Sequence, residues 1–146
     1  MSETQQTGSP GTSPGTGASD HTAAPRVIVV GYSSKPEGRA ALARALAEAR
    51  ARQAEVVVVH TSPDSELADL RAELAASGVP HEIKEAADAL DPAEELITTA
   101  DARAAEFIVI GLRRRSPVGN LLLGSNAQRV LLDAACPVLA VKAETV

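Results

Sequence analysis

Short apolar runs alternate along the chain with longer segments in which apolar residues recur at helical spacing. Val and Ile dominate most of the short runs, as is typical of strands buried on both faces of a sheet. These runs predict strands at Val27–Val30, Val56–Val59, His81–Ala86, Phe107–Ile110 and Pro137–Val141. The run at His81–Ala86 is the most polar of the five. We therefore expect that strand at an edge of the sheet.

The longer segments predict helices, because Leu and Ala recur in them every three or four residues. Three of them are expected at Pro36–Arg52, Pro63–Ser77 and Ser125–Ala135, and a fourth begins where Asp91 caps and Pro92 opens a helix. The spacing of Ser34 and Glu37 suits a capping box before the first helix.

This alternation of strands and helices indicates repeated βαβ units with right-handed crossovers. We predict an α/β, Rossmann-like fold: a five-stranded parallel sheet with helices on both faces. A ligand would bind at the carboxyl ends of the strands, where the strand order reverses. The segments to inspect are 31–35, 60–63 and 111–125.

Composition narrows the functional classes. The chain has 146 residues, a net charge of -5 and 1% aromatic residues. An acidic chain with so few rings is a poor nucleic-acid binder, since phosphates need clustered Lys and Arg, and stacked bases need aromatic side chains. One cysteine, Cys136, excludes an internal disulfide and fits a reducing compartment. With no long apolar run and no secretory signal, we expect a cytoplasmic protein without membrane insertion.

The chain divides once. Residues 1–25 consist mostly of Ser, Thr, Gly, Pro, Gln and Ala, which predicts a disordered tail because such a segment has little apolar surface to bury. Residues 26–146 then form one domain.

The segment from Gly111 to Ser125 carries the most chemistry. Gly111 follows a predicted strand, and Gly124 with Ser125 opens a helix whose free N–H groups suit an anion. Arg113, Arg114 and Arg115 lie between them. This segment is either a phosphate cradle or a solvated basic loop beside an ordinary Ser cap, and composition does not choose between the two.

Residues Arg26 to Lys142 resemble the universal stress protein family. Gly111-x2-Arg114-x9-Gly124-Ser125 is similar to the family's G-x2-G-x9-G-[ST] nucleotide signature, and Cys136-Pro137-Val138-Leu139-Ala140-Val141 is similar to its C-terminal strand. The resemblance implies a five-stranded parallel α/β sheet and a dimer formed through the last strand. Some members of the family bind ATP and others do not.

The resemblance also implies roles for single residues. Gly111, Gly124, Ser125 and Asn126 match phosphate-facing positions, and Thr61 falls where a backbone group meets adenine. Two positions depart from the family: Arg114 replaces its second glycine, and Ser33 replaces an aspartate that contacts the nucleoside. ATP, with magnesium, is therefore a possible ligand rather than a required one. Arg114 itself could close the site or act as a phosphate ligand.

These observations favour a dimeric regulatory or stress-response module over an enzyme. We predict no catalytic residues and no metal ligands, and His60 is expected to have a packing or capping role. The alternatives are a family member that binds no nucleotide and acts through protein contacts, for example with a transporter, and a weak nucleotide hydrolase. An apolar edge strand must be covered or paired. We therefore expect a second copy to pair with Val138, Leu139, Ala140 and Val141.

Overall fold

The computed structural model describes residues 26–86, 91–114, 121–122 and 124–143. The predicted tail at residues 1–25 lies outside these ranges, so the division of the chain near residue 25 stays a prediction.

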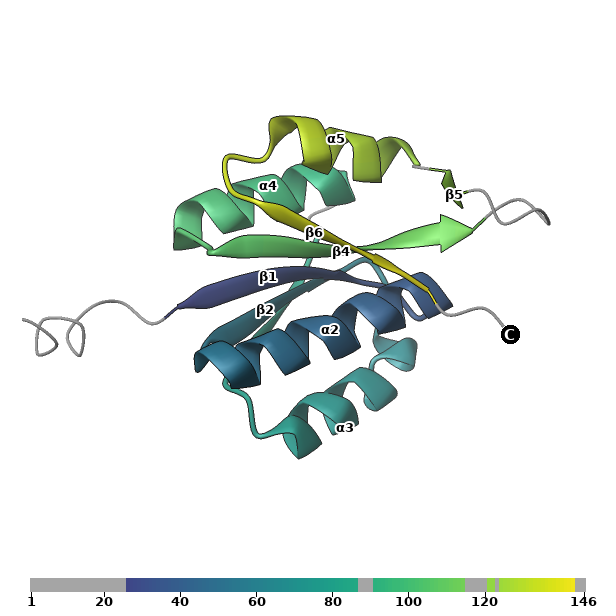
Figure 1. Cartoon of the computed structure of the whole chain (residues 1–146). Coiled ribbons are helices and arrows are strands. Elements are labelled where there is room, and N and C mark those ends of the chain that lie inside the picture. The colour runs from purple at the N-terminus through teal and green to yellow at the C-terminus, as the bar shows by residue number, and fades with distance from the viewer. Residues whose placement is uncertain (1–25, 87–90, 115–120, 123, 144–146) are drawn as a thin grey trace, which may run out of the picture.

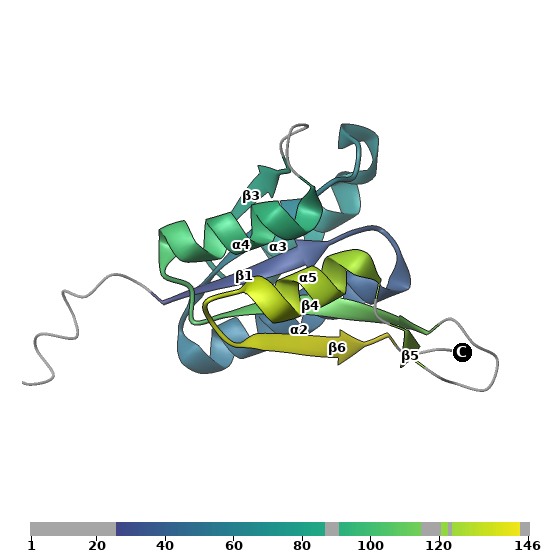
Figure 2. The same cartoon turned by 90° about the horizontal axis from the view of Figure 1, so that it is seen from above.

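Five parallel strands form the centre of the molecule. They are β1 (Val27–Tyr32), β2 (Glu55–His60), β3 (His81–Glu85), β4 (Phe107–Arg114) and β6 (Val138–Lys142). The order across the sheet is β3-β2-β1-β4-β6, with β3 and β6 at opposite sides (Figure 2). The predicted five-stranded parallel sheet is confirmed, and so are the edge positions of the polar strand β3 and, among the described strands, of the apolar strand β6.

Helices cover both faces of this sheet, as predicted (Figure 1). On one face lie α2 (Pro36–Arg52) and α3 (Ala68–Ser77), and on the other α4 (Pro92–Arg103) and α5 (Ser125–Asp133). The two interfaces are separate aliphatic clusters: Leu42 and Leu70 belong to the first, and Ala93 and Val130 to the second. β-Branched residues suit the strands between them, because each strand is covered on both sides.

The predicted helix at Pro63–Ser77 is wrong in its first turns. Residues Asp64–Glu66 form a 3-10 turn (η2), and α3 begins only at Ala68. Between them lies Leu67, which is buried and donates its N–H to the carbonyl oxygen of Asp64. The break therefore places the Leu67 side chain in the core.

The predicted capping box before α2 is also wrong. Lys35 occupies the N-cap position and no side chain caps the helix there. The Ser34 hydroxyl instead donates to Oε1 of Glu66 at 3.1 Å. The Asp91 cap of α4 is confirmed, because its Oδ1 accepts from the Glu94 N–H at 2.8 Å.

Other boundaries shift by a few residues. β4 continues beyond the predicted end at Ile110 as far as Arg114, where it pairs antiparallel with β5 (Leu121–Leu122), a strand that the sequence did not predict. α5 ends at Asp133 rather than at Ala135. Within the described part of the chain, no helix is both long and apolar enough to cross a membrane.

Candidate functional site

The strand order reverses between β1 and β4, which lie side by side in the sheet. After β1 the chain passes through α2 on one face and returns as β2, whereas after β4 it passes through α5 on the other face and returns as β6. α2 and α5 both begin at the carboxyl ends of these strands (Figure 1). This is the crevice in which open α/β sheets bind ligands.

Two adjoining cavities occupy the crevice, with volumes of about 310 and 370 Å³. They share five bordering residues: Glu37, Gly111, Arg113, Asn126 and Ala127. The smaller cavity is completed by Leu112, Gly124 and Ser125. The larger one extends toward the end of β1 and has aliphatic side chains from Leu96, Ile110 and Val130 along its wall.

Glycines allow the elements around the crevice to approach one another closely. A Cβ on Gly111 would lie 2.0 Å from the carbonyl oxygen of Glu37, and a Cβ on Gly38 would lie 2.3 Å from the amide nitrogen of Ser33. Real Cβ atoms do not make contacts this short. Gly111 therefore lets the start of α2 rest directly on the end of β4.

Gly124 serves a different purpose. It is the N-cap of α5 with φ -69° and ψ 167°, and a Cβ there would have no atom of the other described residues within 4 Å. Within the described residues no side chain caps this helix, so there the first N–H groups of α5 border the smaller cavity without a capping partner. α2 also begins without a side-chain cap, at Lys35. Two helix N-termini, each with a partial positive charge, meet at this crevice.

Among the described residues, one ion pair crosses the crevice. Nε of Arg113 lies 3.3 Å from Oε2 of Glu37, and both residues border both cavities. Lys35 adds a second cation at the larger cavity. The sequence analysis placed Arg113 in a basic segment but missed Glu37 and Lys35. No sequence signal indicated them, because the contact of Glu37 depends on how α2 meets β4.

The structure brings six of the seven predicted site residues to the crevice. Ser33 and Thr61 border the larger cavity, Gly124 and Ser125 the smaller, and Gly111 and Asn126 both. The Ser33 hydroxyl accepts a hydrogen bond from the Lys35 N–H at 3.3 Å. Arg114 is the last residue of β4 and pairs with Leu121. The strand ladder thus extends through Arg114, the position at which the resemblance implied a glycine.

His60 has the packing role that the sequence predicted. Its side chain is buried at the end of β2, with Nδ1 3.1 Å from the carbonyl oxygen of Ser62. In the described ranges, no group of three or more His, Cys, Asp or Glu side chains could hold a metal ion.

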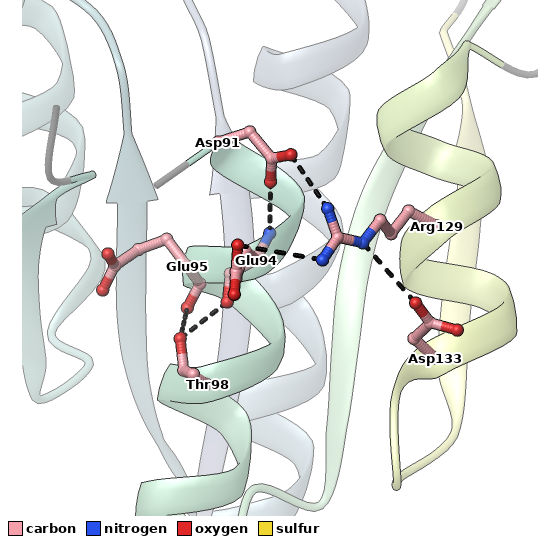
Figure 3. Close-up of polar contacts among 6 residues, drawn as sticks. All are labelled: Asp91, Glu94, Glu95, Thr98, Arg129 and Asp133. Atoms are coloured by element: carbon pink, nitrogen blue, oxygen red, sulfur yellow. Dashed lines mark hydrogen bonds and ion pairs between the residues drawn. The ribbon is translucent and has the colours of Figure 1, made fainter. Parts of the chain in front are cut away.

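Exposed ion pairs connect α5, which forms one wall of the crevice, to α4 (Figure 3). The Arg129 guanidinium lies 3.0 Å from Oδ2 of Asp91 and 3.7 Å from Oε1 of Glu94, and its Nε lies 3.5 Å from Asp133. Asp91 is also the N-cap of α4, so one carboxylate both caps the start of that helix and pairs with α5.

Comparison with known sequences agrees with this geometry. The sequence profile of the universal stress protein family matches residues 25–91 and 62–142. The chain belongs to the universal stress protein family. A curated family member from Mycolicibacterium smegmatis is 46% identical over 127 residues, covering 80% of this chain and 97% of that protein. The resemblance drawn from the sequence is confirmed.

Solved structures of the family share the fold. A universal stress protein from Archaeoglobus fulgidus is 30% identical with a TM-score of 0.63, covering 82% of this chain and 100% of that one. A universal stress protein from the same organism, solved in complex with dAMP, is 25% identical with a TM-score of 0.57 and covers 82% of this chain and 98% of that one. These family members thus share the Rossmann-like α/β architecture of this chain.

Proposed function

We propose that this family member is a regulatory stress-response module that binds an adenine nucleotide, ATP among the candidates, without being an enzyme. The observation that carries the proposal is the pair of adjoining cavities at the strand ends. The smaller cavity meets the uncapped start of α5 at Gly124, and the larger one offers an aliphatic wall. Helix N–H groups suit phosphate oxygens, and aliphatic side chains suit the faces of a purine.

The ligand class is supported by the relative solved with dAMP, which has the same fold over 82% of this chain. We place the nucleoside in the larger cavity beside Ser33 and Thr61, and the phosphates in the smaller cavity beside Gly111, Gly124, Ser125 and Asn126. Magnesium would accompany a polyphosphate by binding its oxygens, as this ion commonly does in nucleotide sites.

Titration calorimetry with ATP, ADP, AMP and adenosine, with and without magnesium, tests the proposal. The informative variant is Gly124→Asp, because nothing lies within 4 Å of its Cβ and Asp is a favourable N-cap. Its carboxylate would occupy the anion site while α5 stays folded. Gly124→Asn has nearly the same shape without the charge and is the matched control.

We expect the unaltered protein to bind AMP and ATP, Gly124→Asp to lose about tenfold or more in affinity, and Gly124→Asn to lose much less. Equal affinities for the two variants would contradict a phosphate site at α5. An unaltered protein that binds no nucleotide would refute the proposal and favour the alternative of a module that works through protein contacts. If Arg114→Gly then restored binding, the arginine would be what closes the site.

We further propose that the protein is a cytoplasmic dimer paired through β6. This strand pairs only with β4 among the described strands, and Ala140 is exposed on it. Light scattering on the unaltered protein and on Ala140→Glu tests the interface. We expect a dimer that becomes monomeric in the variant, with unchanged far-ultraviolet circular dichroism. A variant that stays dimeric would exclude this edge.

A further inference from the structure

We propose that Arg113 is the residue that recognises the first phosphate of the nucleotide, and that Glu37 is the residue that positions it. The inference rests on the proposed function and assigns a task to an ion pair that the sequence did not reveal. Arg113 borders both cavities, so it lies at the junction between the expected nucleoside and phosphate sites. The first phosphate of any nucleotide bound there must pass this junction.

The ion pair leaves most of the guanidinium available. A guanidinium has five N–H donors in a fixed planar arrangement. Glu37 engages Arg113 at Nε, and it is the only ion-pair partner that the described part of the chain gives this arginine. Among the described residues the two terminal nitrogens have no hydrogen-bond partner, and their parallel N–H groups match two oxygens of a phosphate.

Glu37 is well suited to hold this arginine in place. Its side chain is 17% exposed, whereas that of Arg113 is 54% exposed. Its backbone is fixed as well, because the carbonyl oxygen of Glu37 lies directly over Gly111. A largely buried carboxylate thus holds an exposed guanidinium, which reduces the entropy that the arginine loses when a ligand binds.

A carboxylate beside a phosphate site could also act simply by repulsion, and the two roles predict opposite results. If Glu37 only repels, Glu37→Gln tightens nucleotide binding, since a negative charge near the phosphate disappears. If Glu37 positions Arg113, the same substitution weakens binding, because the arginine is released into solvent. The sign of the change therefore distinguishes the roles.

The experiment compares AMP with adenosine, since these ligands differ only by the phosphate. Calorimetric affinities are measured for the unaltered protein, Arg113→Gln, Glu37→Gln, the double variant and a matched control. The control is Arg44→Gln, because Arg44 is likewise an arginine on the surface (49% exposed) that pairs with a glutamate, Glu48, but neither residue borders either cavity. Thermal melts verify that each variant is folded.

We expect Arg113→Gln to weaken AMP binding by about ten- to a hundredfold, the usual loss when one charged hydrogen-bond partner is removed. Adenosine binding should change much less than AMP binding, because adenosine has no phosphate for the guanidinium to bind. Arg44→Gln should leave the binding of both ligands unchanged. Glu37→Gln should weaken AMP binding, and the double variant should be no weaker than Arg113→Gln, because the two side chains act as one unit.

Three results would overturn the inference. Equal losses for AMP and adenosine in Arg113→Gln would mean that the arginine only shapes the cavity. Tighter AMP binding by Glu37→Gln would mean that Glu37 acts only by repelling the phosphate. An unaltered protein that binds neither ligand would refute the proposed function together with the inference, and is distinguishable from the other two because no variant is needed to see it.

Discussion

Gly111→Ala places a single methyl group where β4 and α2 touch. The new Cβ would lie 2.0 Å from the carbonyl oxygen of Glu37 and 2.5 Å from its carbonyl carbon, and ordinary contacts begin near 3.4 Å. The start of α2 must therefore retreat by more than 1 Å. Because the obstacle is backbone rather than the end of a flexible side chain, we expect a cost at the upper end of the range for overpacked cores, about 3 kcal/mol.

Thermal unfolding followed by far-ultraviolet circular dichroism measures this cost. For a domain of this size, each kcal/mol lowers the melting temperature by about 4 °C, so Gly111→Ala should melt about 12 °C lower. Gly124→Ser is the control: it adds a Cβ in the same crevice, where nothing lies within 4 Å, and should change stability by less than about 0.5 kcal/mol. If Gly111→Ala has the same melting temperature as Gly124→Ser, the close contact between Gly111 and α2 is refuted.

Three further predictions concern the core, a helix cap and a titration. Leu70→Ala removes a fully buried side chain of the α2–α3 cluster and should cost about 2–5 kcal/mol in urea unfolding; a loss below about 1 kcal/mol would contradict that packing. Asp91→Ala removes both the cap of α4 and an ion pair to Arg129, so it should cost about 1 kcal/mol or more by the same method, whereas Asp91→Asn should retain part of the cap. Burial raises the pKa of Tyr32 above its ordinary value of 10.0. The folded protein then holds the phenol proton more tightly, so this stabilisation is complete below about pH 10 and lost as the pH rises through the folded pKa. Tyr32 is the only tyrosine and the chain has no tryptophan, so tyrosinate absorbance reports it alone, and a midpoint equal to that of the denatured protein would contradict the prediction.

The elements that could be predicted from the sequence are those whose pattern is local. The run Val56–Val59 reads as a buried strand because β2 is covered on both faces, and Pro36–Arg52 is helical over its whole predicted length. Helix starts depended on context. Asp91 caps α4 as predicted, but the Ser34 hydroxyl is taken by Glu66 from another segment, which no local pattern could show.

Some residues of the candidate site could likewise be predicted from local sequence, and others could not. Glycine spacing indicated Gly111 and Gly124, since a strand end and a helix start leave recognisable signals in sequence. The reasons for the two glycines differ, however, and only coordinates reveal them: Gly111 is required by the backbone of α2, while Gly124 has open space around it. The Arg113–Glu37 pair joins segments far apart in the chain, so it depends on the packing of α2 rather than on any motif.

α5 is anchored to the molecule less firmly than the helices of the opposite face. Val130 is its one buried residue, whereas α2 buries six. Unfolding α5 alone therefore exposes little apolar surface and breaks mainly the exposed ion pairs of Arg129, which high salt screens. Amide protons of this helix should exchange with solvent before those of the central strands. One wall of the crevice thus opens as a separate unit of the native ensemble. A ligand bound there would slow the hydrogen exchange of α5 at concentrations too low to raise the melting temperature of the sheet.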